Sequence, residues 1–345
     1  MRFPEFEGEW KKKKFDQICT IATGNKNTQD KEVDGDYPFF VRSETIERIN
    51  SYSFDGEAIL TAGDGVGVGK IFHYVNGKVG VHQRVYILSD FKCFGKYAYY
   101  YFTSRFYNRV KRMSAKNSVD SVRRDMIAQM SISLPGFDEQ SKIARFLSLL
   151  DERIATQNKI IEQYKSLING LTHFALNGKQ ANVRLKDCVA CNSSVLTESE
   201  FEGGKGLHPV YGATGIIAYS LQYTVGEDSI LVIKDGANVG RVQYVTGKYS
   251  AIGTLNYLTA KSDFSLRYIY YLLRCFNFDK YKVGSGIPHI YFKDYGNELI
   301  YCPPIEEQNK IAGILSLVER KLDLEQILLH TFSLHKQYIL KKMFI

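Results

Sequence analysis

The sequence predicts an α+β fold, in which two β-rich globular units are each followed by a long helix and are related as an internal pseudo-twofold repeat. Three observations predict it. Residues 134–154 and 302–322 share nine identical residues at a constant offset of 168, about half of the 345-residue chain. These two segments are copies of one motif. Short apolar runs punctuated by Gly, Asn and Asp precede each copy of the motif, and a heptad pattern follows each copy. Such self-similarity indicates a tandem duplication.

Strands are expected in the part of the chain that precedes each copy of the motif. Apolar and aromatic runs bounded by turn-forming residues predict them, at Tyr37–Val41, Ala58–Leu60, Lys70–Val75, Arg84–Leu88, Pro209–Tyr211, Ser229–Ile233, Arg241–Val245 and Leu255–Thr259. Asn76-Gly77 and Thr246-Gly247 are predicted to form hairpin turns. An aromatic helix is expected to begin at residues 96–102, KYAYYYF, and another at residues 267–273, RYIYYLL.

A long helix is predicted after each copy of the motif. Proline suits the approach to a helix but not its interior, and Pro135 and Pro303 stand at these places. Apolar residues then recur with a 4-3-4-3 spacing, which is typical of a coiled-coil seam. We therefore expect two antiparallel coiled-coil helices. The polar residues at the centre of the two seams, Gln157 and Glu325, are expected to meet and to set the register.

These signals divide the chain into four segments. Residues 1–135 and 179–303 are expected to form the globular domains. Residues 136–178 are expected to form a central helix, and residues 304–345 a C-terminal helix. In an antiparallel pairing, Ile143 would face Ile339 and Leu171 would face Ile311.

Composition restricts the class of protein. Hydrophobic residues make up 44% of the chain and aromatic residues 13%, which is enough for well-formed cores. A membrane span needs about 18 consecutive apolar residues, and we find no such run. The opening MRFPEFEGEWKKKK lacks the apolar stretch of a secretory signal. Six cysteines at irregular spacing fit reduced thiols. A cytoplasmic protein is therefore expected.

The basic residues are concentrated in two stretches. The net charge is +8, and residues 96–124 contain eight Lys/Arg against the single acid Asp120. Residues 267–293 contain five Lys/Arg against Asp279. One such stretch is compatible with a solvated surface. Two at matching places in a repeat favour a polyanionic partner, because neutralising phosphates needs clustered Lys and Arg.

The motif search favours a protein without catalytic residues. The glycine-rich run Gly63–Lys70 lacks the pattern of a phosphate-binding loop, and an expected strand follows it instead of a helix. Cys188 and Cys191 form an isolated CxxC, whereas zinc usually needs two more ligands at close spacing. His82, His208 and His289 have no histidine at the matching place in the other repeat. No metal site is expected.

Polar and basic residues around the glycine-rich turns and in the basic stretches are the candidates for DNA contacts. Arg and Lys suit phosphates and guanine, and Asn and Gln suit adenine. An exposed loop side chain without a ligand is the alternative for each of them. The candidates are Lys70, Gln83, Arg84, Lys111, Arg112, Lys116, Asn117, Arg123, Arg124, Arg241, Thr254, Asn256, Lys282, Ser285, His289 and Lys293.

The chain resembles the specificity subunits of type I restriction–modification systems. The resemblance rests on the pattern P-x-x-x-E-Q-x-x-I-A-x-x-L-S at Pro135–Ser148 and Pro303–Ser316, the heptad helices and the opening FPEFEGEW. It implies that each globular unit is a target recognition domain that reads one half of a bipartite, asymmetric site in double-stranded DNA. It also implies a helical spacer that docks two methyltransferase subunits, to which restriction (motor) subunits attach. S-adenosylmethionine, ATP and Mg²⁺ would belong to those partners.

Apolar residues outside the seam are candidates for partner binding. Phe146, Leu149, Ile314 and Leu317 occupy matching places in the two helices, and packing under the neighbouring globular domain is the alternative. Two other classes remain open for the whole chain. The first is a self-contained restriction nuclease or methyltransferase. The second is a coiled-coil scaffold without a DNA role. The bases recognised, the spacer length and the oligomeric state do not follow from the sequence.

Overall fold

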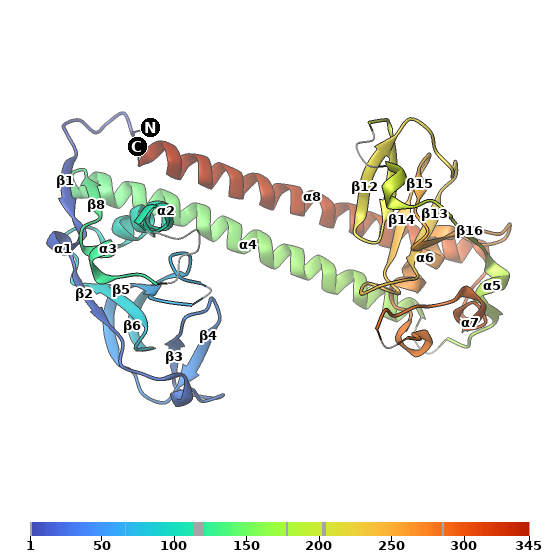
Figure 1. Ribbon diagram of the computed structural model, residues 1–345, viewed down its shortest axis with the longest axis horizontal. Coiled ribbons are helices and arrows are strands. Elements are labelled where there is room, and N and C mark those ends of the chain that lie inside the picture. Colours follow the sequence, from blue (N-terminus) through green and yellow to red (C-terminus); the bar gives the residue numbers. More distant parts are fainter. Residues whose placement is uncertain are drawn as a thin grey trace. The chain divides into compact units, whose positions relative to one another are not determined.

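The computed structural model describes residues 2–65, 67–113, 121–176, 179–201, 205–284 and 286–344. Contacts divide the chain into two compact units (Figure 1). Unit 1 comprises Met1–Asn158 and Leu328–Ile345, and unit 2 comprises Lys159–Ile327. Each unit therefore combines one β-rich part with one end of each long helix. The candidates Lys116, Asn117 and Ser285 lie outside the described residues.

Unit 1 is built on a six-stranded sheet of order β2-β7-β5-β6-β3-β4. Neighbouring strands are antiparallel except β3 and β6, which are parallel. The strands are β2 (Thr20–Thr23), β3 (Tyr37–Phe40), β4 (Ile46–Ile49), β5 (Phe54–Ala62), β6 (Phe72–Val81) and β7 (Val85–Ser89). All four strands expected in this half are present, although β6 is longer than predicted.

Helices and a two-stranded ribbon complete unit 1. The ribbon pairs β1 (Lys11–Lys14) with β8 (Ser131–Leu134). The helices are α1 (Phe15–Ile18), the 3-10 turn η1 (Thr28–Asp30), α2 (Gly95–Met113) and α3 (Arg124–Ala128). The aromatic residues of α2 enter the main core, where Phe72 of the sheet meets Phe102 and Phe106 edge to face. The expected aromatic helix is thus present and joins the sheet to the rest of the unit.

The predicted hairpin turn at Asn76-Gly77 is wrong. Both residues lie inside β6, where Asn76 pairs with Glu57 and Gly77 with Gly56 of β5. Gly77 has a φ of 126° and Gly56 has a φ of 138°, so the strand pair bends here without ending. The sequence pattern was misleading because a glycine that allows a strand to bend resembles one that reverses the chain.

Unit 2 repeats this architecture with two smaller sheets. The first has the order β10-β16-β13-β14 and is antiparallel. The second has the order β12-β11-β15, in which β11 and β15 are parallel. Their strands are β10 (Val189–Ser193), β11 (His208–Gly212), β12 (Gly215–Ser220), β13 (Ser229–Ile233), β14 (Val242–Val245), β15 (Ser250–Ala251) and β16 (Leu255–Ala260).

The predicted hairpin at Thr246-Gly247 is also wrong. The strands on either side of it, β14 and β15, belong to different sheets and do not pair with each other. Gly247 has a φ of 77° and redirects the chain from one sheet to the next. The single strand β6 of unit 1 therefore corresponds to two strands in unit 2.

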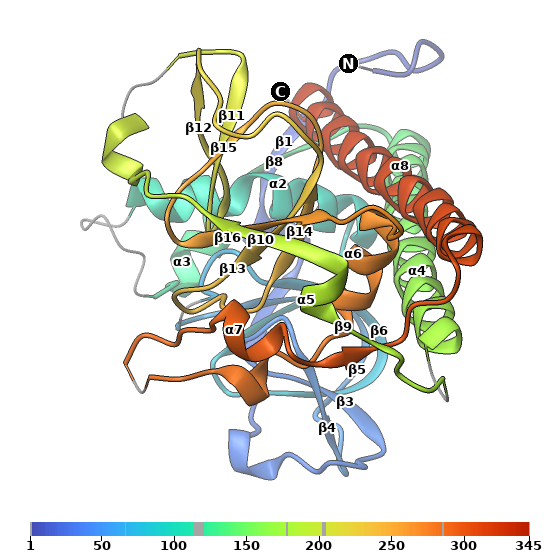
Figure 2. The ribbon, with the colours of Figure 1, turned by 90° about the vertical axis from the view of Figure 1, so that its right-hand side faces the viewer.

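The remaining elements of unit 2 connect its sheets to the long helices. They are β9 (Val183–Arg184), β17 (Leu299–Ile300), α5 (Leu185–Cys188), α6 (Leu266–Arg274), α7 (Phe292–Tyr295) and the 3-10 turns η2 (Glu198–Phe201) and η3 (Asp279–Tyr281). Strands β9 and β17 form an antiparallel pair. Figure 2 shows α6, which begins at the second expected aromatic segment, between the larger sheet and the long helices.

The two long helices are α4 (Phe137–Leu176) and α8 (Ile305–Met343). Within unit 1, the beginning of α4 packs on the end of α8. Asp151 forms an ion pair with Lys336, and the Arg153 guanidinium lies 5.3 Å from the Phe332 ring. Within unit 2, the end of α4 and the beginning of α8 line one pocket, which includes Leu171 and Ile311. The two helices are therefore antiparallel in each unit.

The repeated motif forms the joint between each globular part and its helix. The side chain of Gln140 accepts a hydrogen bond from the Phe94 N–H (2.9 Å) and donates one to the Pro135 carbonyl (2.8 Å). Gln308 does the same with Ser265 (2.9 Å) and Pro303 (2.7 Å). Both glutamines are buried, so these bonds satisfy polar groups that water does not reach. The motif is thus explained by packing within the chain.

A buried tyrosine makes a second repeated connection. The Tyr100 hydroxyl donates to Asp151 Oδ2 (2.7 Å), and its counterpart Tyr271 donates to Glu319 Oε2 (2.7 Å). Burial raises the pKa of both hydroxyls, with that of Tyr271 reaching about 12. The hydroxyls are therefore neutral donors at physiological pH. They fix the aromatic helix of each unit on its long helix.

Candidate nucleic-acid interface

The glycine-rich loop of unit 1, residues 63–70, brings together three segments that are distant in sequence. The Gly63 N–H donates to the Arg84 carbonyl (2.8 Å), and the Gly63 carbonyl accepts from the Val122 N–H (2.7 Å). Asp64 forms an isolated antiparallel bridge with Ser121. The loop therefore joins the turn before β7 to the segment that leads into α3. Basic candidates stand on both.

Asp64 organises two arginines beside this loop. Its carboxylate accepts a 2.9 Å hydrogen bond from Arg42 NH1 and lies 3.5 Å from Arg84 NH1. Arg84 is exposed, as are Gln83, Arg123 and Arg124. A carboxylate that pairs with arginines restricts their rotamers and leaves their remaining donors directed outward. Arg42 was missed by the sequence analysis, although its place directly after the expected strand at residues 37–41 could have drawn attention to it.

The other end of the loop rests on α2. Gly69 lies against the side chains of Tyr107 and Val110, and Lys70 Nζ stands 5.1 Å from the Tyr107 ring centre. Lys111 and Arg112 follow at the exposed end of the same helix. The structure thus gathers Lys70, Arg84, Arg123 and the end of α2 around one loop, which we call the unit 1 basic site.

His82 is a buried residue that contacts the unit 1 basic site through the backbone of Arg84. Its Nδ1 accepts a 3.0 Å hydrogen bond from the Arg84 N–H. Only a neutral imidazole can accept at this nitrogen. Burial and the nearby Arg42 lower the pKa of His82, so the neutral form is favoured. His82 therefore positions the turn that carries Gln83 and Arg84.

Unit 2 repeats the arrangement around residues 234–241. The Ile290 N–H donates to the Lys234 carbonyl (2.9 Å), and the Gly236 N–H donates to the Pro288 carbonyl (3.0 Å). Asp235 forms an antiparallel bridge with His289, and its carboxylate lies 2.6 Å from His289 Nδ1. In both units, the acid of a glycine-rich loop thus pairs with a basic side chain beside it. His289 stands where unit 1 has Ser121.

The remaining basic candidates of unit 2 surround this loop. Arg241 is exposed at its end and borders a pocket between the β11–β12 turn and strands β13 and β14. Lys282 forms a 2.6 Å ion pair with Asp279, which reduces its availability. Lys293 is exposed on α7, with Nζ 5.3 Å from the Tyr291 ring centre. Arg241, His289 and Lys293 form what we call the unit 2 basic site.

Asn256 and Thr254 do not occupy the exposed positions expected of base readers. Asn256 is buried within β16, and its Oδ1 accepts a hydrogen bond from the Ser193 hydroxyl at 3.3 Å. Thr254 is half-buried, and its hydroxyl oxygen is enclosed. The burial of Asn256 is unfavourable for direct base contact, because β16 places this side chain on a face that the rest of the unit covers. A DNA contact of Thr254 stays a prediction.

The partner-binding candidates have different surroundings in the two units. Leu149 and its counterpart Leu317 are 56% and 61% exposed, and Ile314 is 47% exposed. Phe146 is half-buried, and its ring meets Phe3 edge to face at 5.9 Å. The alternative of packing within the chain therefore applies to Phe146, whereas the other three remain on the surface.

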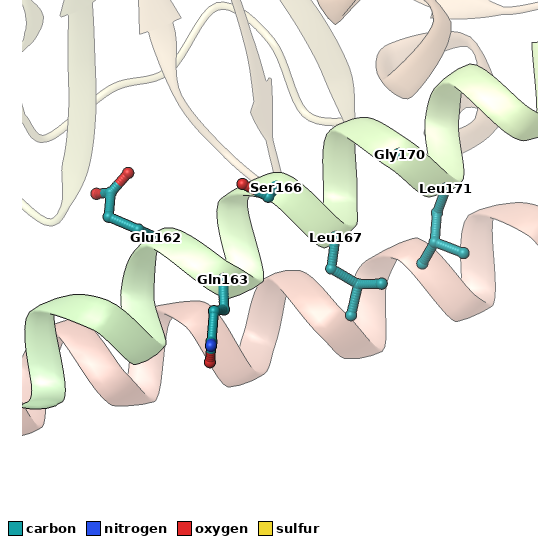
Figure 3. Close-up of a pocket in the computed structure, with 6 residues that line it drawn as sticks. All are labelled: Glu162, Gln163, Ser166, Leu167, Gly170 and Leu171. Carbon is teal, nitrogen blue, oxygen red and sulfur yellow. The ribbon is translucent and has the colours of Figure 1, made fainter.

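Other apolar groups are exposed along the same helices. Figure 3 shows a hollow on α4 in unit 2 that is lined by Glu162, Gln163, Ser166, Leu167, Gly170 and Leu171. Large apolar side chains are also exposed at Phe174, Leu324 and Ile327. Apolar groups gathered on a surface indicate a contact with another protein. Gln157 is buried and Glu325 is half-buried. Their role in register stays a prediction.

The fold and the two basic sites define a protein with two similar nucleic-acid-binding units on long helices. The family model described as "Type I restriction modification DNA specificity domain" matches residues 7–166 and again residues 179–330. The chain belongs to this family of specificity subunits, which are non-catalytic components of type I restriction–modification complexes. The matched family is neither one of nucleases nor one of methyltransferases, so the self-contained enzyme is not supported.

Two relatives illustrate the similarity. A protein of Mycoplasma pneumoniae, described as a type I specificity subunit, is 26% identical over 334 residues, which cover 88% of this chain and 87% of that protein. The specificity subunit of the type I restriction enzyme EcoDI of Escherichia coli is 26% identical over 175 residues. These cover 50% of this chain and only 38% of that subunit.

A solved structure supports the fold. The crystal structure of the S subunit of a type I restriction–modification system from M. genitalium has a TM-score of 0.75 at 19% identity, over 100% of this chain and 99% of that chain. In the described part of the chain, we find no helix that combines the length and apolar character needed to cross a membrane.

Proposed function

We propose that this chain reads a bipartite, asymmetric DNA sequence, with the unit 1 basic site contacting one half and the unit 2 basic site contacting the other. One observation carries the proposal. In both units the acid of a glycine-rich loop pairs with a neighbouring arginine or histidine, and exposed basic side chains such as Arg84 and Arg241 lie beside the loop. The residues that pair with the loop acids differ between the units, Ser121 in unit 1 and His289 in unit 2, which suits two different half-sites.

The exposed apolar residues of α4 and α8 support docking of methyltransferase subunits. Leu149 and Leu317 occupy the same place in the repeated motif, so two copies of one partner would meet similar surfaces. We propose two methyltransferase subunits, with restriction (motor) subunits attached through them. S-adenosylmethionine, ATP and Mg²⁺ would be bound by those partners. The cytoplasm is the proposed compartment because the DNA and these partners are found there.

The test is coexpression of the chain with the methyltransferase subunit of a type I system, followed by mapping of methylated bases in the host DNA. We expect a motif with two defined halves separated by unspecified positions. A continuous motif, or no methylation above that of the methyltransferase alone, would contradict the proposal. A purified chain that methylates or cleaves DNA alone would instead support the self-contained enzyme.

A further inference from the structure

The surface that the repeated motif presents at the start of α4 is covered by residues 2–10. Arg2 binds Glu139 through two hydrogen bonds, Nε to Oε1 (2.8 Å) and NH2 to Oε2 (2.7 Å). Lys142 Nζ lies 4.8 Å from the Phe3 ring centre and 5.8 Å from that of Phe6. Lys142 also forms an ion pair with Glu5. The segment thus matches a carboxylate with a guanidinium, and a lysine with aromatic rings and a carboxylate.

The matching surface of α8 in unit 2 keeps these features but lies open. Glu307 and Lys310 stand where unit 1 has Glu139 and Lys142. Glu307 is exposed, whereas Glu139 is 1% exposed, and the two lysines are both exposed. Ile314 takes the place of Phe146. No hydrogen bond or ion pair involves the Glu307 side chain within the described residues. The second copy of the motif therefore has the same recognition groups without the segment that occupies the first.

An apolar pocket opens beside these groups. It lies between the end of α4 and the beginning of α8, and its described lining is Leu171, Phe174, Ala175, Lys179, Glu307, Ile311, Ile314 and Leu315. The opening is explained by smaller side chains. Ala175 stands where unit 1 has Met343, which is buried in the core, and Ile314 replaces the larger Phe146. An apolar pocket beside a carboxylate suits an aromatic side chain that neighbours a cation.

We propose that this pocket binds an extended segment of a partner protein in which an arginine or lysine precedes an aromatic residue. The cation would pair with Glu307, the aromatic ring would enter the pocket against Ile314, and Lys310 would lie over a ring as Lys142 does in unit 1. A partner is favoured over a second copy of this chain, because Arg2 and Phe3 of each copy already cover unit 1. This inference rests on the proposed function in one respect only, which is that the chain has a partner subunit.

The experiment uses the full chain and, as a probe, a labelled peptide with the sequence of residues 2–10, RFPEFEGEW. Binding is followed by fluorescence anisotropy. We expect saturable binding that weakens at least tenfold in Ala175→Phe, which fills the pocket, and in Glu307→Arg, which reverses the charge. A peptide with Glu and Ser in place of its first two residues should bind at least tenfold more weakly.

Several results would overturn the proposal. One is that the peptide does not bind to the wild type. Another is that it binds to Ala175→Phe and to Glu307→Arg as tightly as to the wild type. Dimerisation of the chain that Ala175→Phe abolishes would assign the pocket to a second copy instead. DNA binding is measured on the same variants and should be unchanged. A wild type that does not bind DNA would contradict the proposed function. The peptide result would still decide what occupies the pocket.

Discussion

At the scale of single residues, the structure assigns different tasks to polar groups that look alike in sequence. Gln140 and Gln308 are buried and serve the joints between domain and helix, whereas Gln83 is exposed beside the unit 1 basic site. Asp64 and Asp235 orient basic side chains. We therefore expect direct contact with DNA from the exposed residues that these groups hold in place.

Replacing the glutamine of a joint should destabilise its own unit. Gln140→Leu leaves the Phe94 N–H and the Pro135 carbonyl without their partner, at a cost of about 2–6 kcal/mol for two buried groups. Trp10, the only tryptophan of the chain, lies in unit 1 with its ring 6.5 Å from that of Tyr97. Its fluorescence in urea should show an earlier transition for Gln140→Leu. The matched variant Gln308→Leu, in unit 2, should leave that transition unchanged.

The buried His82 should make unit 1 sensitive to acid. Its pKa is lowered in the folded state, so below about pH 6.5 the unfolded chain takes up a proton that the folded chain excludes. Stability therefore falls as the pH drops below this value and levels off below the folded-state pKa. His82→Asn keeps an acceptor for the Arg84 N–H and does not titrate. Its Trp10 transition should depend less on pH between 7.5 and 5.5, and an unchanged dependence would contradict this assignment.

At the scale of elements, the sequence predicted which segments are strands and helices better than how they connect. Period and composition are local properties, so β3, β5, β13, β16 and both long helices were found. The two glycine turns were wrong because pairing partners decide whether a strand reverses or continues. The burial of Asn256 and the pairing of Asp64 with Arg42 could not be predicted, since both depend on contacts between segments distant in sequence.

The glycine-rich loop of unit 2 provides an element-scale prediction. Gly240 has a φ of 88°, and a Cβ there would lie 2.6 Å from Phe278 Cβ. Gly236 has a φ of 98°, and a Cβ there would meet nothing within 4 Å. Both alanine variants incur the backbone strain of about 1–2 kcal/mol, but only Gly240→Ala adds overpacking of about 1–3 kcal/mol. Hydrogen exchange of β13 should therefore be faster in Gly240→Ala than in Gly236→Ala.

The surface of the long helices provides a second prediction at the scale of elements. Leu149→Glu and Leu317→Glu place charges on exposed apolar positions, so folding should be almost unaffected while binding of a methyltransferase subunit weakens. Each change should remove one of two bound subunits, and the double variant both, as measured by the mass of the copurified complex. Exposed Lys159→Glu serves as a control. Full occupancy in the double variant would show that the partners dock elsewhere.

At the scale of the whole molecule, duplication explains why one chain carries two similar units, to which we assign the two halves of the DNA target. The joints, the antiparallel helix ends and the loop–acid pairs are repeated, while the exposed residues of the two basic sites differ. Specificity can therefore change in one unit without disturbing the fold of the other.

The central claim is that each basic site reads one half of the DNA target. Mapping methylated bases in cells that coexpress the methyltransferase with Arg84→Ala or with Arg241→Ala tests it most directly. Each arginine that reads a guanine contributes about 1–3 kcal/mol of discrimination. We predict that Arg84→Ala relaxes specificity in one half of the motif only, and that Arg241→Ala relaxes it in the other half only. Changes in the same half, or in both halves for either variant, would contradict the account.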